Sequence, residues 1–142
     1  MTSINRSSCP VILQAVLLVS LTFPLAVSGQ KTGALQIAEA LVAAFNQHDP
    51  AAMAAMVTSD FELYYVNDEG VAELALRGPE QLAAEMTSYF ETRPRVESRI
   101  AGAIDGPTFV SVREQIVGGQ SSLSVYEVRD RLVRRVWYFP AE

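Results

Sequence analysis

The spacing of apolar residues changes along this 142-residue chain. Between Ala34 and Gln47 they recur every three or four positions, which predicts an amphipathic helix with one buried face. The residues of this face are Leu35, Ala38, Leu41, Val42 and Phe45. Asp49 and Pro50 predict where this helix ends and where a short helix over residues 51–57 begins, because aspartate caps free N–H groups and proline fits a first helical turn.

The next segments alternate between strand and helix patterns. Residues 61–66 and 71–77 are predicted as short strands around a turn at residues 67–70, and a third helix is predicted over residues 80–91. From residue 94 onward the period is two, which predicts strands over residues 95–104, 108–117, 121–129 and 132–139. Tight turns are expected at residues 105–107, 118–119 and 130–131. This order predicts an α+β domain rather than βαβ units.

Residues 1–28 have a different composition from the rest of the chain. Arg6 precedes an apolar stretch over residues 11–27, and Ala26 and Ser28 are small residues at the two positions that a signal peptidase reads. We predict a cleaved signal peptide over residues 1–28, a linker over 29–33 and one domain over 34–142. The protein is then secreted or periplasmic, with no stable membrane insertion after cleavage. The alternative is an uncleaved N-terminal membrane anchor.

Composition narrows the range of partners and cofactors. The net charge is −5, and an acidic surface disfavours nucleic acid as a partner. The single cysteine, Cys9, lies within the predicted signal peptide, so the mature domain is expected to lack disulfides and thiolate ligands. With His48 as the only histidine, we predict no metal site, and the sequence indicates no cofactor.

Four short segments together resemble the NTF2-like superfamily, and within it the SnoaL-like proteins. They are the helix end at residues 45–49, the strand opening at residues 60–65, the helix entry at residues 76–80 and the final pair of strands. The resemblance implies an NTF2-like cone, with three N-terminal helices packed on a curved, mostly antiparallel sheet. It also implies an apolar pocket inside the cone, but no particular reaction, because one fold hosts many functions.

The resemblance also implies which strand faces look into the cone. In the strand over residues 108–117, the face with Arg113 and Gln115 is expected inside, together with Tyr126 and Trp137 from the next two strands and Tyr65 at the mouth. These five residues are the predicted ligand-binding set. Arg113 favours a mostly apolar ligand with an anionic or carbonyl group, because a charge in an apolar cavity needs a partner. A register shifted by one residue would instead turn Arg113 and Gln115 to solvent, and a partner such as Glu62, Glu97 or Glu114 would make Arg113 structural.

No acid/base set for catalysis is apparent. The ketosteroid isomerases of the superfamily use a carboxylate base, a tyrosine and a protonated aspartic acid; this chain is expected to place Tyr65, Leu41 and Ser124 at those positions. Catalytic residues are therefore left unassigned, and His48 beside Asp49 is only a minor candidate.

Three functions remain open from the sequence. The first is an exported domain that binds a small apolar or aromatic ligand in the conical cavity. The second is an isomerase, cyclase or hydrolase acting on a polyketide- or steroid-like substrate. The third is a protein-interaction module that uses the convex face of the sheet. A homodimer is also predicted, through an apolar outward surface made of Val110, Val112, Ile116, Leu123, Val125 and Val136.

Overall fold

Three helices and six strands make up the part of the chain that the structure, a computed structural model, describes: residues 33–140. The predicted signal peptide and residues 29–32 of the predicted linker lie outside it. The elements are α1 (Ala34–Asn46), α2 (Pro50–Ala55), β1 (Val57–Val66), β2 (Ala72–Arg77), α3 (Gly78–Thr92), β3 (Ser98–Asp105), β4 (Phe109–Ile116), β5 (Ser121–Arg129) and β6 (Leu132–Pro140). None of these helices is long and apolar enough to span a bilayer.

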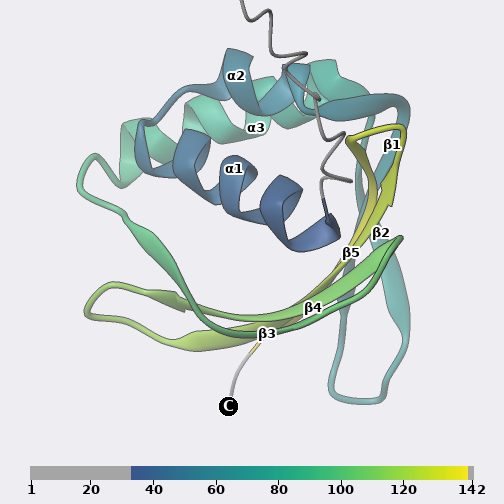
Figure 1. Cartoon of the computed structure of the whole chain (residues 1–142). Coiled ribbons are helices and arrows are strands. Elements are labelled where there is room, and N and C mark those ends of the chain that lie inside the picture. The colour runs from purple at the N-terminus through teal and green to yellow at the C-terminus, as the bar shows by residue number, and fades with distance from the viewer. Residues whose placement is uncertain (1–32, 141–142) are drawn as a thin grey trace, which may run out of the picture.

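The six strands form one mixed sheet in the order β2-β1-β6-β5-β4-β3. The pairing of β1 with β6 is parallel, and the other four neighbouring pairs are antiparallel. Figure 1 shows the strongly curved sheet with all three helices on its concave side. The predicted cone is therefore present. The prediction of three N-terminal helices is wrong, because only α1 and α2 precede the sheet and α3 follows the β1–β2 hairpin.

Irregularities in the strand pairing contribute to this curvature. The register shifts between Leu63 and Tyr64 in β1, between Ile100 and Gly102 in β3, and between Glu127 and Val128 in β5. Such bulges bend a strand and increase its twist. The β5–β6 turn has positive φ angles at Asp130 and Arg131 (53° and 67°), the conformation of a two-residue hairpin whose twist matches that of its strands.

Side chains fix α1 to β3 at both ends of the helix. At the start, the backbone N–H of Leu35 donates to Asp105 Oδ1 at 3.0 Å, so an acid on the sheet takes the place of a local cap. At the end, the Asn46 side chain donates to the Ser98 carbonyl at 2.8 Å and accepts from the Ser98 N–H at 2.7 Å. These bonds hold α1 across the concave face.

The junction between α1 and α2 follows the sequence prediction. The Asp49 carboxylate accepts from the Ala52 N–H at 2.9 Å, and Pro50 occupies the first helical turn. His48 has a positive φ of 51°, stacks on Phe90 at 4.5 Å and contacts the Val96 carbonyl through Nε2 at 2.8 Å. These contacts hold the junction against α3 and the segment before β3, so His48 has a structural position.

Alternate residues of each strand form the core. The concave side buries Phe61, Val110, Val112, Tyr126, Val133 and Val136 against α1 and its neighbours. The predicted outward apolar surface is therefore wrong for Val110, Val112 and Val136, which are at most 5% exposed. It is also wrong for Ile116, which packs against the core. Leu123, from the same predicted set, does lie outward.

Candidate functional site

A cavity of about 330 Å³ lies between the helices and the concave face of the sheet. Its helical wall comes from α1, α2 and α3, with Leu41, Phe45, Met53, Leu82, Met86 and Tyr89 as its main apolar residues. Its sheet wall comes from all six strands and includes Phe61, Leu63, Leu76, Ile116 and Val136. Most of this lining is apolar or aromatic, which is typical of sites for small molecules.

A polar group of side chains interrupts the sheet wall at β3, β4 and β5. It consists of Ser98, Glu114, Ser122, Ser124 and Tyr126. The register places Glu114 opposite Ser122, and Val112 opposite Ser124. The Tyr126 side chain therefore extends along the sheet past the Val112–Ser124 pair, and its phenol donates a short hydrogen bond to Glu114 Oε1.

Burial and the neighbouring carboxylate change the acidity of this tyrosine. Tyr126 is 5% exposed. Burial, the negative charge of Glu114 and the hydrogen bond to it raise the pKa of the Tyr126 phenol well above its usual value, because all three disfavour the phenolate. The nearby Ser124 hydroxyl lowers this pKa by a smaller amount, although it does not reach normal hydrogen-bond geometry. Tyr126 is therefore a neutral donor at physiological pH.

Two hydroxyls on the cavity wall have no hydrogen-bond partner among the described residues. They belong to Ser98 and Ser124, whose side chains are buried. A buried polar atom without a partner is costly unless water or a ligand satisfies it. These hydroxyls therefore mark where a polar part of a ligand, or an ordered water, fits.

The open end of the cavity is aromatic and carries a second carboxylate. Tyr65 is half exposed and meets the Tyr138 ring edge-on at 5.4 Å, and Tyr89 and Glu85 of α3 complete this rim. Partial burial, with smaller contributions from Tyr138, Glu85 and Tyr89, raises the pKa of the Tyr65 phenol. The rim therefore offers aromatic rings and one negative charge to an entering molecule.

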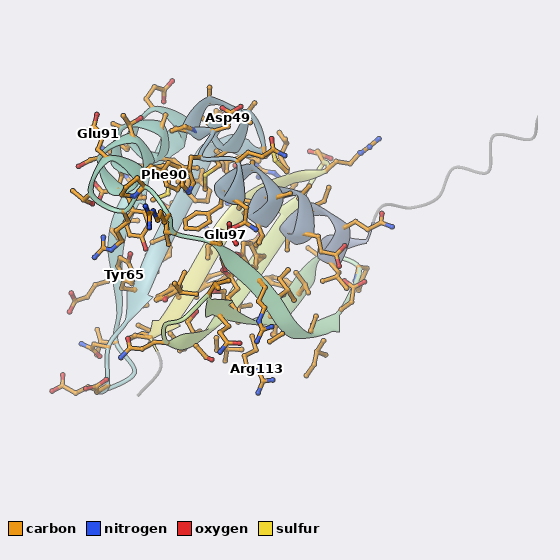
Figure 2. The ribbon with its side chains drawn as sticks, turned by 90° about the vertical axis from the view of Figure 1, so that its left-hand side faces the viewer. Asp49, Tyr65, Phe90, Glu91, Glu97 and Arg113 are labelled. Carbon is orange, nitrogen blue, oxygen red and sulfur yellow. The ribbon has the colours of Figure 1, made fainter. Side chains whose placement is uncertain are left out.

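The structure brings two of the five predicted ligand-binding residues together at the cavity. Tyr65 lies at the rim and Tyr126 on the sheet wall. Arg113 and Gln115 do not line it, and neither does Trp137. Figure 2 shows the Arg113 side chain reaching away from the helices, on the outer side of the sheet. The ligand-binding role of Tyr65 and Tyr126 stays a prediction.

The orientation of the strands explains why Arg113, Gln115 and Trp137 lie outside the cavity. On β4, the concave side carries Val110, Val112, Glu114 and Ile116, so Arg113 and Gln115 face outward. On the outer face Gln115 accepts from Arg99 Nε at 3.0 Å. Trp137 of β6 stacks on Tyr64 at 6.1 Å, on the same outer face. The expectation of an anionic or carbonyl group on the ligand depended on Arg113 inside the cavity. Because Arg113 lies outside it, the structure does not support that expectation.

Sequence reasoning missed Glu114 as a cavity residue, although a signal was present. Val110, Val112 and Ile116 share its face, and that face is the more apolar of the two. The more apolar face of an amphipathic strand packs on the core. Applied to β4, this rule places Glu114 inside and Arg113 outside, as observed.

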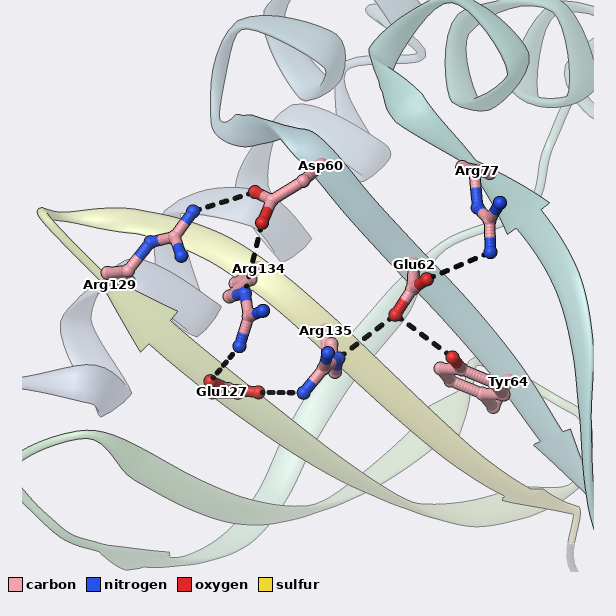
Figure 3. A network of polar contacts seen from close by, with 8 residues as sticks. All are labelled: Asp60, Glu62, Tyr64, Arg77, Glu127, Arg129, Arg134 and Arg135. Carbon is pink, nitrogen blue, oxygen red and sulfur yellow. Dashed lines mark hydrogen bonds and ion pairs between the residues drawn. The ribbon is translucent and has the colours of Figure 1, made fainter.

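The convex face carries a chain of alternating charges. Asp60 pairs with Arg129 at 2.7 Å and with Arg134 at 3.2 Å, and Glu127 pairs with Arg134 at 3.0 Å and with Arg135 at 3.4 Å. Glu62 continues the chain to Arg135 at 3.0 Å and to Arg77 at 3.1 Å. Figure 3 shows this network, which runs across β2, β1, β6 and β5. Every carboxylate in it has at least one arginine partner.

These contacts lower the pKa values of two carboxyl groups. The nearby Thr58 hydroxyl, although it does not reach normal hydrogen-bond geometry, and the hydrogen bonds from Arg134 and Arg129 hold the pKa of Asp60 well below its usual range. Hydrogen bonds from Arg135 and Tyr64 lower the pKa of Glu62. The network lies on the outer face, where it links β1 to β2, β6 and β5, and no arginine lines the cavity.

Comparison with known proteins agrees with this geometry. The family model of the SnoaL-like domain matches residues 38–136. The chain belongs to the SnoaL-like domain family. Comparison with curated protein sequences gives no match.

Solved structures with the same fold come from several bacteria. A SnoaL-like protein of unknown function from Burkholderia thailandensis is 23% identical, with a TM-score of 0.64 over 76% of this chain and 93% of that one. An uncharacterised cystatin-fold protein from Novosphingobium aromaticivorans is also 23% identical, with a TM-score of 0.61 over 73% and 95%. An NTF2-like protein of unknown function from Cytophaga hutchinsonii is 10% identical, with a TM-score of 0.57 over 75% and 88%. At these identities the comparisons show the NTF2-like fold of the SnoaL-like domain.

Within residues 33–140 the structure contains no group of three or more histidine, cysteine or acidic side chains positioned to hold a metal ion. The polar contact that the described residues place inside the apolar enclosure is the hydrogen bond between Tyr126 and Glu114.

Proposed function

We propose that this SnoaL-like domain binds a small, mainly apolar molecule in the cavity, with the polar end of that molecule against Glu114 and Tyr126. The observation that carries the proposal is the combination of an apolar cavity of about 330 Å³ with two buried hydroxyls, Ser98 and Ser124, that have no partner among the described residues. Apolar walls supply affinity, and a few polar groups fix orientation.

Calorimetric titration with neutral apolar alcohols, from cyclohexylmethanol to 1-naphthalenemethanol, tests this proposal. We expect saturable binding of at least one of them to the wild-type protein. Ser124→Leu should abolish it, because the larger side chain projects into the cavity. Val125→Leu is the matched control on the outer face of the same strand and should bind as the wild type does. No saturable binding by any alcohol at millimolar concentration, or unchanged binding by Ser124→Leu, would overturn the proposal.

A second candidate is an enzyme that moves a proton, and the Glu114–Tyr126 hydrogen bond favours it. A carboxylate in an apolar cavity can accept a proton from carbon. The phenol has one O–H, which it can turn from Glu114 to a developing oxyanion once Glu114 is protonated. Deuterium incorporation next to the carbonyl of 2-tetralone, followed by NMR in D₂O, tests it. Exchange that is faster than in buffer and is lost in Glu114→Gln supports this candidate; exchange that is equal in wild type and variant contradicts it.

Export belongs to the same proposal and rests on the sequence of residues 1–28. We expect the mature protein to begin near Gly29. Intact-mass measurement of protein recovered from outside the cytoplasm of its native host checks this, and a mass that includes residues 1–28 contradicts cleavage.

We also propose a homodimer through the convex face, now on a different set of residues. Ile104, Phe109 and Leu123 are exposed apolar side chains of this face, at 79%, 50% and 45%. Light scattering at micromolar concentration should give twice the mass of one chain. The Leu123→Glu variant should give the mass of a single chain. A wild-type monomer would contradict the dimer.

A further inference from the structure

The cavity combines two negative charges with no positive one. Glu114 lies on its sheet wall and Glu85 at its rim, and no lysine, arginine or histidine belongs to its lining. Arg113, the arginine next to Glu114 in the chain, points to the other side of the sheet. Within residues 33–140, neither Glu114 nor Glu85 takes part in a salt bridge, whereas the three carboxylates of the convex network all do.

The hydrogen bond from Tyr126 satisfies Glu114 only in part. A carboxylate has two oxygens with about four acceptor positions, and Tyr126 occupies one of them at Oε1. The phenol is neutral, so it does not cancel the charge. Glu114 is partly buried, and a carboxylate that has lost part of its contact with water is stabilised by a nearby counter-charge. The empty side of Glu114 therefore favours a cation over an anion.

The rest of the lining suits a cation with an apolar body. The Ser124 side chain is 1% exposed, and its hydroxyl, which can accept an N–H, has no partner among the described residues. The rings of Phe45, Tyr65 and Tyr89 contribute to the cavity wall, and aromatic faces attract ammonium groups. Hydroxyl oxygen, carboxylate and aromatic ring together are the acceptors that an ammonium group needs.

Resting on the proposed binding function, we propose that the ligand of this cavity is an organic amine: an apolar, protonated molecule whose ammonium group binds Glu114 beside Tyr126 and Ser124. Carboxylic acids of the same shape are excluded, because Glu114 and Glu85 repel them and no cation compensates. This conclusion is opposite to the one that Arg113 suggested from the sequence.

Three ligands with one ring system and different charge test the proposal: 1-naphthylmethylamine, 1-naphthalenemethanol and 1-naphthoic acid. Each is titrated calorimetrically into the wild-type protein at pH 7. We expect the amine to bind about 10- to 100-fold more tightly than the alcohol, the range for a charge-assisted hydrogen bond. The acid should bind more weakly than the alcohol.

Glu114→Gln keeps the shape of the side chain and removes its charge. It should bring the affinity for the amine close to that for the alcohol, while the affinity for the alcohol changes by less than about threefold, which also shows that the variant is folded. Glu127→Gln is the matched control, since it removes a carboxylate from the convex face. It should keep the preference for the amine.

The outcomes separate the two proposals. Equal binding of amine and alcohol by the wild type, or tighter binding of the acid, would overturn the amine proposal and leave the binding function intact. A preference for the amine that persists in Glu114→Gln would overturn the role of Glu114. If none of the three ligands binds and the neutral alcohol series also fails, the binding function itself is wrong.

Discussion

The two faces of the sheet are built from the same strands, but their carboxylates have different partners. On the convex face, Asp60, Glu62 and Glu127 each pair with arginine. On the concave face, Glu114 is hydrogen-bonded to a neutral tyrosine inside an apolar cavity. Paired charges at a surface contribute modestly to stability, whereas an uncompensated charge in a cavity is costly to retain and points to a function.

The largest effect on stability should come from placing a charge on the concave face of β4 rather than on its convex face. Val112→Glu places a charge at a position that is 0% exposed and should lower the free energy of unfolding by on the order of 4 kcal/mol or more. Arg113→Glu changes the exposed neighbour and should alter it by about 0.5 kcal/mol or less. Urea denaturation followed by circular dichroism measures both. The reverse ranking would mean that the strand register is wrong.

A smaller difference is expected from removing one hydroxyl on each face. Tyr126→Phe leaves Glu114 without its hydrogen-bond donor in the cavity and should cost about 1–3 kcal/mol of the free energy of unfolding. Tyr64→Phe is the matched variant on the convex face, where the phenol donates to Glu62 at 2.9 Å. It should cost less, because Arg135 and Arg77 still pair with Glu62. Equal losses in the same denaturation assay would contradict the contrast between the faces.

Acid should weaken the convex network. The pKa values of Asp60 and Glu62 are lowered in the folded protein from ordinary values of 3.8 and 4.5. Their contribution to stability is therefore complete above those ordinary values and is lost as the pH falls through the lower folded pKa values. The free energy of unfolding should decrease between about pH 4.5 and pH 2, the interval that these shifts define.

Asp60→Asn should flatten this acid dependence, since it removes one of the two shifted groups. Asp68→Asn, in the exposed turn between β1 and β2, is the control and should keep the wild-type dependence. Identical pH profiles for Asp60→Asn and the wild type would show that the network does not set the response to acid.

The smallest expected signal is that of the only tryptophan. Trp137 stacks on Tyr64 outside the cavity, so a non-absorbing ligand such as cyclohexylmethanol should leave its fluorescence nearly unchanged while binding is seen by calorimetry. Quenching that follows the binding isotherm would place Trp137 at the ligand, or reveal coupling between the faces.

Local patterns in the sequence determined most of the fold. The three- and four-residue spacing of α1, the cap formed by Asp49 before α2 and the period of two from residue 98 onward each depend on neighbouring residues, so they could be predicted without a partner in space. The resemblance to SnoaL-like proteins added the cone and its cavity. The resemblance also implied that Tyr126 lies on the inner face, where it is found.

Only the tertiary structure decided which set of alternating residues faces inward on β4 and β6. Alternation assigns Val112 and Arg113 to opposite faces, but a shift of one residue exchanges those faces without changing the pattern. Contact with the helices decides the question, because burying Val110 and Val112 against the helical layer removes apolar surface from water, whereas burying Arg113 would require a counter-charge. The pairing of Tyr126 with Glu114, and with it the negative character of the cavity, follows from that choice.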